Sequence, residues 1–179
     1  DHYVRSERVP ELVALLETEH ADAAIAAVEE APPASSLAGE RIWIDAAYAH
    51  DEPHDIVHHL EALADAVPLA AQAASAIRAA SPTAVAATLE LVRRSARVEH
   101  LRRAIDLEYR VGMRLVAEHD FLEGVRAMLI DKDRRPEWRP ATIEEVDPER
   151  IRALFDPVGG LEVDWSLGPL GPAPHPRGE

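Results

Sequence analysis

Apolar side chains recur every three or four positions along most of this chain, the spacing that places them on one face of an α-helix. The pattern is clearest in residues 97–118, where two adjacent apolar stripes run side by side. One stripe consists of Val98, Leu101, Ile105, Tyr109, Gly112 and Val116, and the other of Ala104, Leu107, Val111 and Leu115. Two neighbouring stripes indicate burial over a wide arc. We therefore expect residues 97–118 to form the longest helix and to be central in the packing.

Capping residues and prolines indicate where other helices begin. Ser6 is a candidate N-cap, Ser81 precedes a proline at another helix start, and Asp120 with Glu123 has the spacing of a capping box. Further helices are expected over residues 21–30, from Asp51 and Pro53, from Pro68, and over residues 148–155. The segment Ile42-Trp43-Ile44 is either a short strand or an aromatic plug, and we favour the plug because no partner strand is evident nearby.

The periodicity predicts an all-α fold class for this chain. We group it into N-terminal helices over residues 1–80, a helical region over residues 81–156, and a Gly/Pro-rich tail over residues 157–179. Alanine fills much of the expected core, and small side chains bury little apolar area each. Such a core would gain stability by docking against a larger partner.

The composition excludes several classes of protein. A net charge of −14 argues against general binding to nucleic acid or to an anionic membrane, and no apolar run approaches the roughly 20 residues of a membrane span. The chain has no cysteine, which excludes disulfides and cysteine nucleophiles, and we expect a cytoplasmic protein. Residues 93–139 nevertheless carry 12 Lys and Arg against 9 Asp and Glu. This local positive balance would favour a small anionic ligand.

One long segment carries a family resemblance. It runs from His119 through Asp120-Phe121-Leu122-Glu123-Gly124-Val125-Arg126-Ala127 and Leu129-Ile130-Asp131-Lys132-Asp133 to Pro136-Glu137-Trp138. Upstream, Ser81-Pro82-Thr83 and Glu108-Tyr109-Arg110 stand at similar spacing. Together these motifs resemble the C-terminal signature of 3-hydroxyisobutyryl-CoA hydrolases, a branch of the crotonase (enoyl-CoA hydratase/isomerase) superfamily. The resemblance runs from about residue 1 to residue 155.

The resemblance implies that this chain is the helical C-terminal region of a crotonase-type α/β enzyme whose N-terminal core is absent. That core would be its partner and would hold the oxyanion hole and the catalytic carboxylates, so we expect the chain alone to be inactive and to contain no catalytic residue. The whole protein would hydrolyse a 3-hydroxyacyl-CoA thioester, a step of valine degradation. Alternatives are enoyl-CoA hydration or isomerisation and, from another class, a non-catalytic helical interaction module. Acyl-CoA would be the substrate, no cofactor is implied, and the protein could form a homo-oligomer.

Three residues are assigned to substrate binding on the same resemblance. Phe121 would line the acyl or pantetheine region or a lid over it, Lys132 would face a CoA phosphate, and Arg126 would lie near them. Each has a structural alternative. Phe121 could anchor the core, Lys132 could pair with Asp131 or Asp133, and Arg126 could pair with Glu123 three positions earlier.

Other candidate sites have weaker support. His54 and His58 stand at the i, i+4 spacing of two imidazole ligands, with His50 and His59 nearby, but no third ligand is evident, so we predict no metal. A catalytic triad could be assembled from Ser81 or Ser95 with His100 or His119, but their spacing gives it no support. We expect Ser81 to be a helix cap instead.

Overall fold

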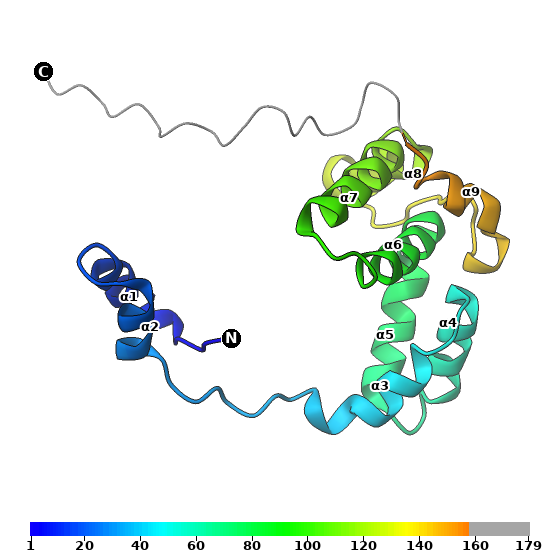
Figure 1. The fold of residues 1–179 in the computed structure, drawn as a ribbon. Coiled ribbons are helices and arrows are strands. Elements are labelled where there is room, and N and C mark those ends of the chain that lie inside the picture. The colour runs from blue at the N-terminus through cyan, green and yellow to red at the C-terminus, as the bar shows by residue number, and fades with distance from the viewer. Residues whose placement is uncertain (158–179) are drawn as a thin grey trace, which may run out of the picture. The chain divides into compact units, whose positions relative to one another are not determined.

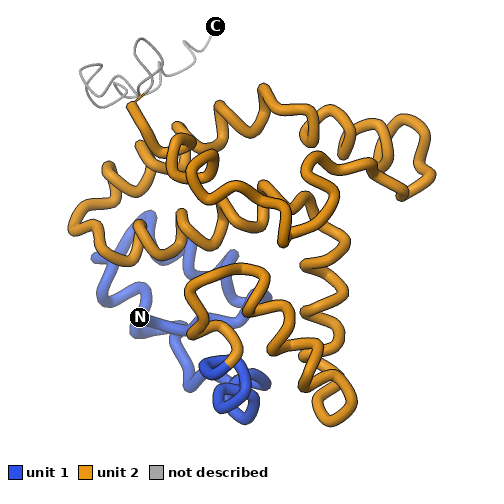
Figure 2. Tube along the Cα trace, turned by 90° about the vertical axis from the view of Figure 1, so that its right-hand side faces the viewer, with its two compact units in different colours: residues 1–46 blue, residues 47–179 orange. Residues whose placement is uncertain are grey.

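The computed structural model describes residues 1–157, so the tail predicted over residues 157–179 lies almost entirely outside the described residues. The chain forms two compact units, one of residues 1–46 and one that begins at Ala47 (Figure 2). This boundary differs from the divisions expected after residues 80 and 156, which group the helices by sequence and stay predictions. None of the helices in residues 1–157 has the length and apolar content needed to cross a membrane.

The first unit contains η1 (Ser6–Arg8), α1 (Val9–Leu16), α2 (Ala21–Val28), η2 (Ala38–Glu40) and most of α3 (Arg41–Ala47). Arg8 ties α1 to the end of α2, because its guanidinium binds Glu11 at 2.9 Å and donates to the carbonyls of Ala27 and Val28 at 3.2 Å. The predicted cap at Ser6 is wrong, since Ser6 lies inside the 3-10 turn and makes no cap bond. These contacts close α1 and α2 into a small hairpin (Figure 1).

The segment predicted as an aromatic plug is part of a helix. Ile42, Trp43 and Ile44 lie in α3, and the Ile42 side chain is 88% exposed. The indole of Trp43 donates to Glu40, which precedes α3. A run of three large apolar residues does not distinguish helix, strand and plug by itself, and the plug prediction was wrong.

The second unit contains most of the helices in residues 1–157. They are α4 (Pro53–Ala62), α5 (Pro68–Ala79), α6 (Pro82–Ser95), α7 (Leu101–Val116), α8 (His119–Val125), the π-helical turn η3 (Arg126–Ile130), η4 (Ile143–Glu145) and α9 (Pro148–Ala153). Proline occupies the first turn of α4, α5, α6 and α9, where its missing N–H costs no helical hydrogen bond. Ser81 caps α6 by accepting from the Ala84 N–H at 3.3 Å, as predicted.

The main core of this unit lies where α6, α7 and α9 meet. Its buried residues are Ala86, Ala87, Val111, Ile151, Leu154 and Phe155. The Arg94 guanidinium lies 4.1 Å from the centre of the Phe155 ring, a cation–π contact at the edge of the core. From α7, Arg114 donates to the carbonyls of Leu154 and Asp156 at 2.6 and 2.7 Å. The end of α9 is thereby fixed to α7.

Helix α7 is the longest helix in residues 1–157, as predicted, but it is not central. One stripe faces the core through Leu107, Val111 and Leu115. The other stripe is open, with Leu101 77%, Ile105 37% and Val116 49% exposed. The predicted wide burial is therefore wrong for residues 1–157, because the sequence shows which positions are apolar but not whether anything covers them.

Candidate functional site

The residues that the sequence singles out lie in α8, η3 and the irregular segment that follows them. Arg126 organises this region through all five of its N–H groups. Its Nε and Nη2 bind the two oxygens of Glu123 at 2.9 and 2.7 Å, and its Nη1 binds one oxygen of each of Asp131 and Asp133 at 2.7 Å. The fifth bond goes from Nη2 to the Arg135 carbonyl at 3.1 Å. A guanidinium has five donors, so none remains for a ligand.

The predicted pair of Arg126 with Glu123 is thus confirmed, and it has an electrostatic consequence. The bidentate contact with Arg126 and, to a smaller extent, the Glu137 N–H, which donates to Glu123 at 2.8 Å, together lower the pKa of Glu123 to about 2. Arg126 also lowers the pKa of Asp133. Glu123 and Asp133 therefore stay ionised beside this guanidinium further into the acid range than ordinary carboxylates do.

Asp120 makes a second set of bonds, which joins three parts of the chain. It is only 9% exposed, and it accepts from the Ser81 hydroxyl at 2.5 Å and from the Arg139 N–H at 2.9 Å. The predicted capping box of Asp120 with Glu123 is wrong, since neither side chain caps α8. Nothing in the local pattern indicates these partners, which stand 39 and 19 positions away.

Trp138 completes the attachment of the irregular segment. Its indole N–H donates to the Ala79 carbonyl, at the end of α5, at 3.1 Å. A Cβ built on Gly124 of α8 would lie 3.4 Å from the Trp138 ring, so the ring packs closely over this glycine. The irregular segment after η3 is therefore bound to α8 and to the end of α5, and through Asp120 to the start of α6.

The structure places the three predicted substrate residues as follows. Phe121 is 46% exposed, so the alternative role as a core anchor is wrong. Lys132 is exposed, with a left-handed backbone at φ 57°, and makes no ion pair within residues 1–157. The alternative pairing of Lys132 is also wrong, because Asp131 and Asp133 both bind Arg126. The substrate roles of Phe121, Lys132 and Arg126 stay predictions, and a ligand at Arg126 would have to displace one of its five acceptors.

The histidines of α4 do not converge on a common point. The rings of His54 and His58 are 6.2 Å apart, His58 lies 3.3 Å from Glu144, and His50 and His59 hydrogen-bond to each other at 2.8 Å. In residues 1–157 no three His, Asp or Glu side chains are grouped closely enough to hold a metal ion. His119 donates to the Glu137 carbonyl at 3.1 Å rather than to a serine. Together, α8, η3 and the irregular segment after them fix a loop on which Lys132 is exposed.

Comparison with known proteins identifies relatives over most of the chain. The family model described as enoyl-CoA hydratase/isomerase matches residues 1–155. Among curated proteins, the chain is 37% identical over 120 residues to the mitochondrial 3-hydroxyisobutyryl-CoA hydrolase of Gallus gallus and 32% identical over 123 residues to that of Homo sapiens. These matches cover 67% and 68% of this chain but only 30% and 31% of the relatives.

Two solved structures are similar over nearly the whole chain. A carnitinyl-CoA dehydratase from Mycobacterium thermoresistibile is 41% identical, with a TM-score of 0.78 over 89% of this chain and 45% of its own. An enoyl-CoA hydratase from Rhodobacter sphaeroides 2.4.1 is 40% identical, with a TM-score of 0.78 over 90% and 46% of the two chains. The chain spans less than half of each.

These similarities correct two expectations. The all-α fold class is wrong: residues 1–157 contain helices and no strand, but the structures that they match have the crotonase fold. Helical periodicity reports local elements, whereas a fold class describes the domain to which they belong. The cytoplasmic localisation is also overturned, because the curated relatives are named as mitochondrial. A lack of cysteine shows only that no disulfide is needed and specifies no compartment.

Proposed function

Because this chain belongs to the enoyl-CoA hydratase/isomerase family, in the branch that resembles 3-hydroxyisobutyryl-CoA hydrolases, we propose that the protein it contributes to hydrolyses a small 3-hydroxyacyl-CoA thioester. In this reaction water adds to the thioester carbonyl, the C–S bond breaks, and the products are a hydroxy acid and CoA with a free thiol. The similarity to the curated hydrolases carries the proposal. Stabilisation of the oxyanion and proton transfer would fall to groups outside this chain.

A second activity, hydration of an enoyl-CoA, is favoured by the two solved structures, a dehydratase and a hydratase. The two reactions differ in their products. Hydrolysis releases free thiol, whereas hydration consumes the conjugated double bond and leaves the thioester intact. Assays of the full-length protein with 3-hydroxyisobutyryl-CoA and with crotonyl-CoA, each followed by thiol release and by enoyl absorbance, distinguish them. Thiol release from 3-hydroxyisobutyryl-CoA supports the hydrolase, and loss of enoyl absorbance alone overturns it.

For this chain we propose the role of a helical support for the catalytic core, without activity on its own. An apolar surface suited to that role runs over α7, α8 and η3. We call it the α7–η3 surface; its exposed residues are Leu101, Ile105, Met113, Val116, Phe121, Leu122, Met128, Leu129 and Ile130. Groups of exposed large apolar side chains are typical of interaction sites. The part of the solved relatives that this chain does not span would cover it.

In the same proposal, the Lys132 ammonium binds a phosphate of CoA. Arg126 binds one oxygen of each neighbouring aspartate, and neither aspartate forms an ion pair with Lys132. An ammonium on a flexible stem pairs with phosphate as a point charge. Phe121, exposed at the start of the same segment, would contact the apolar part of the substrate. No resident cofactor forms part of this proposal, and self-association stays a prediction.

A further inference from the structure

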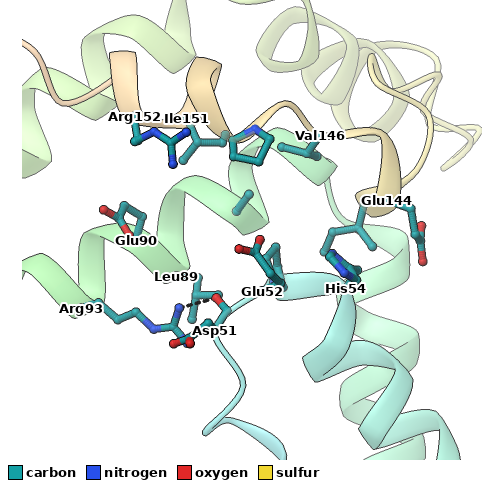
Figure 3. Close-up of a pocket in the computed structure, with 14 residues that line it drawn as sticks. Asp51, Glu52, His54, Leu89, Glu90, Arg93, Glu144, Val146, Ile151 and Arg152 are labelled. Atoms are coloured by element: carbon teal, nitrogen blue, oxygen red, sulfur yellow. Dashed lines mark hydrogen bonds between the residues drawn. The ribbon is translucent and has the colours of Figure 1, made fainter.

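A cavity in the second unit lies away from the signature segment. It has a volume of about 340 Å³ and is bounded by the start of α4, one side of α6, and the chain from η4 to α9 (Figure 3). None of Phe121, Arg126 and Lys132 lines it. A ligand bound here would therefore not contact the three residues assigned to acyl-CoA binding.

The floor of this cavity is aliphatic. Ala86, Ile143 and Ile151 line it and are only 5–6% exposed, and Leu89 and Val146 extend it. Buried side chains at the bottom and polar side chains around the opening are typical of small-molecule sites, and the volume is at the small end of their range. The floor would accommodate a short branched hydrocarbon.

Four acidic residues line the rim, and the side chains of two of them, Asp51 and Glu52, are not bound by an arginine. Glu90 binds Arg94 at 2.6 Å and Glu144 binds Arg78 at 2.6 Å, so both are already neutralised. The Glu52 side chain, at the N-cap of α4, makes no hydrogen bond or ion pair within residues 1–157, and its charge acts on Arg152. Arg93 fixes this part of the rim to α6, because it donates to the carbonyls of His50 and Asp51.

Besides Arg93, the basic part of the rim contains Arg152, which enters the space from the opposite wall (Figure 3). Its Nε and Nη2 bind the two oxygens of Glu149. These two bonds use two of its five N–H groups and leave three donors, including both on Nη1. The cavity thus offers a carboxylate on one wall and a guanidinium with spare donors on the other, above an apolar floor.

From this arrangement we infer that the cavity binds a small aliphatic zwitterion of the α-amino-acid type. Its ammonium would pair with Glu52, its carboxylate with Arg152, and its hydrocarbon side chain would rest on Ile143 and Ile151. A purely anionic ligand would meet the Glu52 carboxylate, and a purely cationic one would meet Arg152. A ligand that carries both charges avoids either repulsion, so the two walls favour a zwitterion.

The inference is tested by titrating the 179-residue chain with L-leucine and following the Ile143 and Ile151 methyl signals by NMR. Two matched probes each lack one charge: 4-methylpentanoate has no ammonium, and 3-methylbutylamine has no carboxylate. Saturable shifts of both methyls are expected with leucine. Each probe should bind about tenfold more weakly or worse, the loss expected when one charge-assisted hydrogen bond is removed.

The variants Glu52→Gln and Arg152→Gln should each weaken leucine binding by about tenfold, whereas Glu99→Gln, an exposed change outside the cavity, should leave it unchanged. Both altered side chains lie on the rim, and circular dichroism confirms that the variants fold. A modest site would bind with a dissociation constant of ~0.2 mM. The inference is overturned if leucine does not shift the two methyl signals at about 20 mM, a hundred times that value. Equal binding of 4-methylpentanoate, or leucine binding unaffected by both variants, overturns it as well.

Discussion

The Ser81 hydroxyl donates to Oδ2 of Asp120 at 2.5 Å, and the same hydroxyl accepts from the Ala84 N–H. One side chain thereby caps α6 and joins it to the start of α8. Asp120 extends the connection to the Arg139 N–H. The irregular segment after η3 is thus fixed to two helices through a single buried carboxylate.

Asp120→Ala should destabilise the chain by about 2–3 kcal/mol, because it leaves the Ser81 hydroxyl and the Arg139 N–H without their acceptor. Urea unfolding measures the change. Asp65→Ala, at an exposed position, is the control and should stay within about 0.5 kcal/mol of the parent. An Asp120→Ala variant as stable as that control would show that the buried carboxylate does not hold the segment.

The glycines of α7 and α8 give a matched comparison. Gly112→Ala in α7 should stabilise the chain by about 0.5–1 kcal/mol, because alanine has the higher helix propensity and nothing lies within 4 Å of the new Cβ. Gly124→Ala should gain less, since its Cβ would press on the Trp138 ring at 3.4 Å. Urea midpoints of the two variants test this order, and a larger gain at Gly124 contradicts the packing.

Glu123 makes stability depend on pH in the acid range. Its pKa is lowered to about 2 in the folded chain, so its contribution is fully present above the unfolded value near 4.5 and is lost as the pH falls toward 2. A carboxyl-carbon NMR titration should show Glu123 still ionised at pH 3. In Arg126→Gln its pKa should rise toward the ordinary value, because Arg126 is the main cause of the shift. Ordinary titration of Glu123 in the parent chain would exclude the bidentate pair.

Lys132→Gln in the full-length enzyme should raise KM for the CoA thioester about tenfold or more with kcat largely retained, since the lost charge-assisted bond contributes mainly to binding. The corresponding pantetheine thioester, which lacks the nucleotide, should be unaffected. Arg97→Gln serves as a control at an exposed cation outside the segment. If KM for both thioesters rises equally, Lys132 does not act on the nucleotide phosphates.

The α7–η3 surface should be needed for association with the catalytic core. A double change of Leu101→Asp and Val116→Asp places charges on two exposed apolar positions, 77% and 49% exposed, so the isolated chain should fold normally. Co-purification of this variant with a separately expressed core should fall well below that of the parent. The double change Glu99→Gln and Arg97→Gln, just before α7, should not affect it. Undiminished association of the aspartate variant would place the contact elsewhere.

The local elements were largely predictable from the sequence because their signals are local. Proline in the first turn of α4, α5, α6 and α9 and the cap at Ser81 both act within one helical turn. The pair of Glu123 with Arg126 follows from i, i+3 spacing in the same way. Such features depend on few residues and can be predicted without knowledge of the packing.

What the sequence could not show depends on distant partners. Aspartate is a common helix cap, yet the carboxylate oxygens of Asp120 accept from Ser81 and Arg139, which stand 39 and 19 positions away. The outer stripe of α7 has the periodicity of a buried face, but burial requires a neighbour that residues 1–157 do not provide. The fold class failed for a similar reason, because helices of this kind can belong to a larger α/β domain.

No regular secondary structure spans residues 131–135, and the Arg126 side chain donates three of the hydrogen bonds that hold them, to Asp131, Asp133 and Arg135. A lysine at position 126 would keep the charge but has three donors and no planar fork. It could satisfy at most three of the five acceptors, so the loop would lose its shape while its net charge stayed the same. At this position arginine is required for its geometry, and an exchange that looks conservative would act like a deletion.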